Sequence, residues 1–168
     1  FSLLHAGLAV FTWYFLQPGY LDISILSDLK LEWILIMYAR NIFLLILIAG
    51  AWHIKLYWQR AQGDRFKYTS RWPTTKSRVF LFGNQVKDNM FWSVLSGGTV
   101  WTAYEVLLVW AYANNWLPYI SFSANPLWFI GWIILIPMWN DFHFYWVHRL
   151  LHWKPLYKLS HYLHHRNV

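Results

Sequence analysis

The sequence contains no cysteine among its 168 residues. This absence excludes disulfides, iron–sulfur clusters, thiolate-ligated haem and cysteine-ligated zinc sites. Any metal that the protein binds must therefore be held by nitrogen or oxygen ligands.

Charged residues are also scarce, at 12% of the chain, whereas apolar residues make up 58% and aromatic residues 22%. A typical soluble domain has about 25% charged residues. A lipid bilayer is a better solvent than water for such a chain, so we expect a single membrane domain over 1–168. Phe1 lies inside an apolar run and Val168 follows a histidine cluster, so we expect the domain to be truncated at both ends.

Four apolar stretches approach the ~20 residues that are needed to cross a hydrocarbon core. They predict an all-α fold, a multi-pass transmembrane helical bundle with about four spans, at about 1–16, 33–57, 90–116 and 127–147. The first span is short because the chain is truncated there. The fourth must continue past Asp141 to reach the required length, and an internal proline is expected to kink it.

The charge of the connecting segments alternates along the chain. Segment 17–32 carries three acids against one lysine, and segment 117–126 carries no charge. Segment 51–89 and the tail after Val147 together hold twelve of the fourteen Lys and Arg residues. Cytoplasmic loops are enriched in these residues, so both basic segments are predicted to be cytoplasmic. The membrane would be the endoplasmic reticulum in a eukaryote or the inner membrane in a bacterium.

Segment 65–78 interleaves aromatic residues with cations. This pattern is found on nucleic-acid-binding surfaces and in anchors to anionic lipid. Topology already explains the charges, so we expect an orienting loop at the membrane interface and no nucleic-acid partner.

Histidines are concentrated at the end of the chain. Six of the eight fall in the final 26 residues: His143, His148, His152, His161, His164 and His165. Residues four apart on a helix project from the same face one turn apart. This spacing separates His148 from His152 and His161 from His165. We therefore predict a cytoplasmic helical cap over 141–168, in which two helix faces present imidazoles to one metal centre.

The break between the two histidine helices is predicted at Trp153, and Pro155 is well placed in the first turn of the second helix. His143 lies nine residues before His152, on the opposite side of an ideal helix, and is the least direct of the candidate ligands. Asp141 and Tyr145 share the face of the first histidine pair, and we predict that they orient imidazoles from outside the metal shell. The alternative for Asp141 is a structural role, either as a helix cap or in contact with lipid head groups.

The spacing leaves the identity of the metal open, because imidazole suits zinc, copper, iron and nickel. A zinc protease needs a glutamate directly after its first histidine ligand, and Arg149 occupies that position here, which disfavours hydrolysis. Two other classes stay open. One is an electron carrier with haem between two histidines, and the other is a non-catalytic metal-binding membrane module. Without a metal, the histidines would be polar residues at the membrane interface.

Segment Asp141–His152, DFHFYWVHRLLH, resembles the fatty acid hydroxylase and sterol desaturase superfamily, as do Leu156–Lys158 and the HYLHH of His161–His165. Segment Phe80–Trp92, FLFGNQVKDNMFW, resembles bacterial-type members, and the similarity runs from about Trp52 to the last residue. The resemblance implies a membrane non-haem di-iron oxygenase. Such an enzyme uses O₂ and an external electron-donor redox protein to hydroxylate or desaturate a lipid, such as a sterol or a fatty acyl chain.

The same resemblance implies specific roles for the histidines. His148 and His152 match the first histidine box, and His161, His164 and His165 match the second, as catalytic metal ligands. A further box lies downstream in the family, whereas this sequence ends at residue 168. We therefore expect these residues alone to be inactive.

Two charges fall inside predicted spans. Arg40 and Glu105 reach similar depth in spans of opposite direction, and an ionisable group in a bilayer is costly unless it is paired. The sequence therefore predicts an ion pair between them. His5 and His53 are expected to be span-end residues and not ligands.

Overall fold

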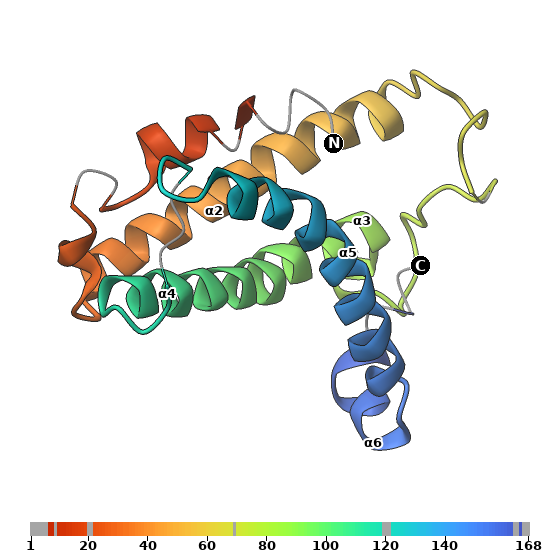
Figure 1. The fold of residues 1–168 in the computed structure, drawn as a ribbon. Helices are drawn as coiled ribbons and strands as arrows, with labels where there is room; N and C mark the ends of the chain where they lie inside the picture. The colour runs from red at the N-terminus through yellow and green to blue at the C-terminus, as the bar shows by residue number, and fades with distance from the viewer. Residues whose placement is uncertain are drawn as a thin grey trace. The chain divides into compact units, whose positions relative to one another are not determined.

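The computed structural model describes residues 7–8, 10–19, 22–68, 70–118, 122–162 and 165. These residues form helices, turns and irregular segments, with no strand among them, which confirms the all-α class (Figure 1). The chain divides into two compact units, Phe1–Leu117 and Pro118–Val168, and each is described by itself. His5 and His164 lie outside the described residues, as do residues 1–6 and 9 of the predicted first span.

Two long helical segments dominate the first unit. One consists of α2, Leu31–His53, extended by the π-helical η3, Ile54–Trp58. The other consists of three consecutive elements: α3, Gln85–Trp92; the π-helical η5, Ser93–Gly98; and α4, Thr99–Ala113. These segments, of 28 and 29 residues, are long and apolar enough to cross a membrane. They coincide with the predicted spans 33–57 and 90–116, except that the second begins at Gln85 and ends at Ala113.

The shorter elements of this unit are η1, Thr12–Leu16, and the 3-10 turns η2, Ile23–Leu26, and η4, Leu81–Gly83. In the η2 turn Leu26 is buried and packs with Trp33 and Met37 of α2 and with Val106 and Val109 of α4. This small core lies between two helices whose other faces expose large apolar side chains, among them Leu35, Phe43 and Leu107. An apolar surrounding would remove the cost of exposing them.

The second long segment begins early because the chain before it folds back on itself. The backbone N–H of Leu81 donates to the Asp88 carboxylate over 2.8 Å, and Asp88 is completely buried. The Asn84 side chain caps α3 by accepting from the N–H of Lys87 over 3.1 Å. The Asn84 cap satisfies a donor that the start of α3 leaves unpaired, so the helix begins at Gln85 and not at the first apolar residue.

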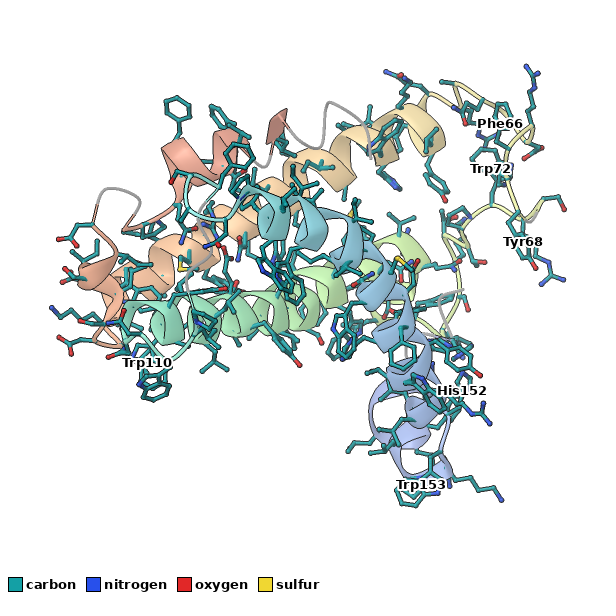
Figure 2. The ribbon with its side chains drawn as sticks, in the orientation of Figure 1. Phe66, Tyr68, Trp72, Trp110, His152 and Trp153 are labelled. Atoms are coloured by element: carbon teal, nitrogen blue, oxygen red, sulfur yellow. The ribbon has the colours of Figure 1, made fainter. Side chains whose placement is uncertain are left out.

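The basic loop between η3 and η4 is organised around Trp72. The Lys67 Nζ lies 3.7 Å and the Arg60 guanidinium 4.4 Å from the centre of its ring. Phe66 and Tyr68 of the same loop are exposed, and Figure 2 shows all three aromatic side chains on this loop. The interleaving of aromatic and cationic residues thus includes cation–π contacts within the loop.

A buried polar network joins the middle of α2 to α4. Arg40 donates from Nη2 to Glu105 Oε2 over 2.5 Å, which confirms the predicted pair. Asn41 donates to the same oxygen over 2.8 Å and to Thr102 Oγ1 over 3.1 Å, and it accepts from Arg40 Nη2 over 2.9 Å. Arg40 also donates to Gln17 Oε1. Each buried charge is therefore paired and hydrogen-bonded, which is the condition for placing it in an apolar interior.

Reversing one charge of this network should destabilise the protein. Arg40→Glu would set two carboxylates together, and an uncompensated buried charge costs about 3–5 kcal/mol. Adding Glu105→Arg should restore most of the loss because the pair is re-formed with opposite polarity. The measurement is the thermal unfolding midpoint in detergent, together with the yield of folded protein. A doubly exchanged variant no more stable than Arg40→Glu would contradict the pair.

The helices α2 and η5 approach closely at Gly98. A β-carbon on Gly98 would lie 2.3 Å from Ile42 Cδ1, whereas one on Gly97 would meet nothing within 4 Å. The missing side chain therefore permits the contact between the two helical segments.

The two adjacent glycines allow a matched test of this contact. Gly98→Leu should lower stability by about 1–3 kcal/mol, the usual cost of overpacking, because Ile42 and then the helix must move aside. Gly97→Leu should cost much less, since its position is open. The thermal midpoints of the two variants, measured in the same detergent, compare the positions directly. Equal losses would contradict a close contact specific to Gly98, because the change from Gly to Leu favours the helix at both positions.

The second unit consists of α5, Pro126–Leu151, followed by α6, Lys154–Leu156, and the π-helical η6, Tyr157–His161. The predicted fourth span, 127–147, lies within α5, which continues as a helix through Pro137. The first part of the predicted histidine helices, 141–151, is the end of α5. Among the residues that the structure describes, the two helices long and apolar enough to span a membrane are both in the first unit, so a membrane crossing by α5 stays a prediction.

Candidate metal centre

The site is formed where the chain turns back after α5. The His152 N–H donates to the carbonyls of His148 and Arg149 over 3.2 Å each, and Trp153 then takes an extended conformation. The Trp153 carbonyl accepts from the N–H of Tyr157 over 2.9 Å and starts the next helix. Pro155 lies in the first turn of that helix, where its missing N–H costs nothing. The predicted break and restart are confirmed, and Figure 2 shows His152 and Trp153 at this turn.

Four histidines from the two sides of the turn meet. One ring nitrogen from each of His148, His152, His161 and His165 lies within 4.8 Å of the other three. The Nε2 of His152 is 3.2 Å from that of His148 and 3.2 Å from that of His165. The Nε2 of His165 is 3.1 Å from that of His161. The predicted convergence of two helix faces is therefore confirmed for these four residues.

The spacing of these nitrogens fits one metal ion. Two nitrogens each about 2.1 Å from an ion lie about 3.0–4.2 Å apart, depending on the angle between the bonds. The three shortest Nε2 separations, 3.1–3.2 Å, fall in this range, whereas the limit for all pairs is 4.8 Å, so the widest pair would have to close slightly for all four nitrogens to bind one ion. No carboxylate of the described residues joins the group. The donor set is therefore four imidazoles, which suits iron, zinc, copper or nickel.

The rings are packed mainly edge to face, and His152 and His161 each lie within 4.9 Å of the other three ring centroids. The ring centroid of His161 lies 4.6 Å from that of His148, 4.8 Å from that of His152 and 4.7 Å from that of His165. His161 is only 5% exposed, whereas His152 and His165 are exposed. A metal ion at this position would thus be closed off on the side of His161 and open on the other.

Tyr157 belongs to the site although no chemical role was predicted for it. Its ring stacks on His152 at a centroid distance of 5.8 Å and lies 5.8 Å from His165 and 6.1 Å from His161. The signal in the sequence is its position four residues before His161, which puts it on the same helix face. Its ring thus packs against three of the four imidazoles.

The other predicted site residues have different contacts. His143 lies outside the cluster, and its ring stacks on Trp139 at 6.5 Å. The Tyr145 hydroxyl accepts from Arg149 Nη1 over 2.8 Å, and Asp141 is exposed, so the described contacts connect neither to an imidazole of the cluster. His53, expected at a span end, stacks on Tyr57 at the end of α2.

Comparisons with protein-family models, with curated proteins and with solved structures found no match for this chain. The chemistry of the site therefore has to be inferred from its own geometry. The resemblance to the fatty acid hydroxylase and sterol desaturase superfamily stays a prediction.

The cluster can be tested by removing one imidazole. His152→Ala should weaken metal binding by more than the roughly 10–100-fold that is typical of losing an outer-shell partner, because His152 would bind the ion directly. His143→Ala, nine residues away on the same helix, is the matched control and should leave the affinity unchanged. Titration with Co²⁺, followed by its absorption spectrum, measures both variants. Equal affinities in the two variants would show that the cluster does not hold the metal.

Proposed function

We propose that this chain belongs to an O₂-dependent membrane oxidoreductase that hydroxylates or desaturates a lipid at a histidine-ligated di-iron centre. The observation that carries the proposal is the convergence of His148, His152, His161 and His165 on one point. Their spacing accommodates one ion. A second iron would take its ligands from residues beyond these four, with His164 the predicted candidate within this sequence.

The donor set favours redox chemistry over hydrolysis. A hydrolytic zinc site needs a general base beside its ligands, and Arg149 stands next to His148 where such a protease has glutamate. Oxidation of an unactivated C–H bond needs an oxidant that side chains cannot provide, and bound iron would supply it from O₂ and external electrons. The task of the chain itself is to hold the metal, exclude competing ligands and orient the lipid.

Two observations support a lipid as the substrate. Two helical segments are long and apolar enough to cross a membrane, and α5, which leads directly into the site, exposes a long series of apolar and aromatic side chains. In the proposed topology four spans place the histidine cap at the cytoplasmic face. An apolar chain would then reach the metal from the bilayer, while an electron-donor protein would approach from the cytoplasm.

The arrangement disfavours the haem alternative. A porphyrin must lie between its two axial histidines and occupies the plane around the iron, which excludes other side chains. Here His165 Nε2 lies 3.1 Å from His161 and 3.2 Å from His152, so the nitrogens crowd one small volume. A single ion fits that volume better than a macrocycle does.

Metal analysis of the protein purified in lipid nanodiscs tests the proposed function. We expect iron, its loss in His148→Ala, and its retention in His143→Ala. With reductant, O₂ and membrane lipid, the full-length iron-loaded protein should form an oxidised lipid, detected by mass spectrometry. Zinc in place of iron would contradict the oxygenase, and an absorption band typical of haem would support the electron carrier instead.

A further inference from the structure

A hollow lies beside the histidine cluster. Its volume is about 390 Å³, and it is lined by His152, Lys154, Pro155, Tyr157 and Lys158. Two of these residues also belong to the metal centre, because His152 is one of its four ligands and Tyr157 braces three of its imidazoles. A molecule in the hollow would therefore touch the site itself.

The charged residues that line this hollow are both lysines. Lys154 and Lys158 are exposed and stand four residues apart, so they project from neighbouring turns of one helical segment. No Asp or Glu follows Asp141 in the sequence, and Arg149 and Arg166 add further positive charge to this part of the chain.

A bound metal would increase this imbalance. Four neutral imidazoles leave the charge of a divalent ion uncompensated, and cations near one another repel more strongly where water is partly excluded. A carboxylate or phosphate in the hollow would offset the charge of the ion and of both lysines. Lysine binds such groups as a compact charge with three donors on a flexible stem.

Exposed apolar side chains lie close in sequence to the residues that line the hollow. Trp153 is 63% exposed, Leu150 57% and Leu159 82%, and all three lie within seven residues of His152. Long lysine side chains can lie along such a surface while their ammonium groups stay polar-facing. A ligand that matches both features has an anionic head and a hydrocarbon tail.

We infer that this hollow binds the anionic head group of an amphipathic lipid, a carboxylate or a phosphate, between Lys154 and Lys158. This inference rests on the proposed function and narrows its substrate class to acidic lipids. Because His152 lines both the hollow and the metal cluster, the carbon atoms next to the head group come closest to the metal. A neutral sterol would leave both lysines uncompensated.

Binding of four probes to the metal-loaded protein in nanodiscs tests the inference. Decanoate and decyl phosphate carry the acidic head on a short tail, decanol carries the tail alone, and inorganic phosphate carries the head alone. Calorimetry with empty nanodiscs subtracted isolates binding to the protein from partition into lipid. We expect the two acidic amphiphiles to bind about tenfold or more tightly than decanol or inorganic phosphate, as charge-assisted hydrogen bonds require.

Substitution of the lysines provides the decisive comparison. Lys154→Gln combined with Lys158→Gln should remove the preference for acidic amphiphiles, whereas Lys76→Gln combined with Lys87→Gln removes the same charge elsewhere and should preserve it. Equal binding by both double variants would overturn the inference, and so would inorganic phosphate binding as tightly as decyl phosphate. Metal content, measured in the same samples, separates the two proposals. If the iron-loaded protein binds acidic amphiphiles without the two lysines, only the inference about the hollow is refuted. If the protein takes up no iron, the proposed oxygenase function is refuted.

Discussion

The reversal of the chain at His152 and Trp153 is the constraint on which the candidate site depends. Two histidines precede the reversal and two follow it, and neither pair alone offers enough ligands for a closed metal site. The extended conformation of Trp153 ends one helix, and its carbonyl begins the next by accepting from Tyr157. Pro155 favours this restart because its ring fixes the backbone angle that the first helical turn needs. Local backbone preferences therefore assemble residues that are up to seventeen positions apart, His148 and His165.

A different constraint governs the first unit. Its helices are apolar on most faces, so hydrophobic contacts alone specify their relative rotation weakly. The network of Arg40, Asn41, Thr102 and Glu105 supplies the missing specificity, because each buried polar group must find its partner. Gly98 complements it by allowing α2 to approach closely. Directional polar contacts and one small residue thus define an interface that is otherwise made of interchangeable apolar side chains.

Much of this could be predicted from the sequence, because the decisive signals were local or followed from simple depth arguments. The i, i+4 spacing predicted the pairing of His148 with His152 and of His161 with His165, and equal depth predicted the Arg40–Glu105 pair. The same helical phase made His143 the least direct of the candidate ligands, and it lies outside the group of four histidines. The start of α3 at Gln85 was missed, since the polar cap formed by Asn84 lies before the apolar run that marked the span. Tyr157 was missed as a site residue because an aromatic residue in the sequence does not by itself indicate a functional site. Its role is visible only from its contacts with the histidines.

The unequal exposure of the four imidazoles has a consequence for metal exchange. His161 closes one side of the cluster, whereas His152 and His165 are open to the surroundings. A metal ion and a lipid would therefore both reach the site from the exposed side of His152 and His165. If the proposed site binds both, a bound lipid would block the exit of the metal ion, so the lipid-bound protein would lose its metal to a chelator more slowly than the lipid-free protein.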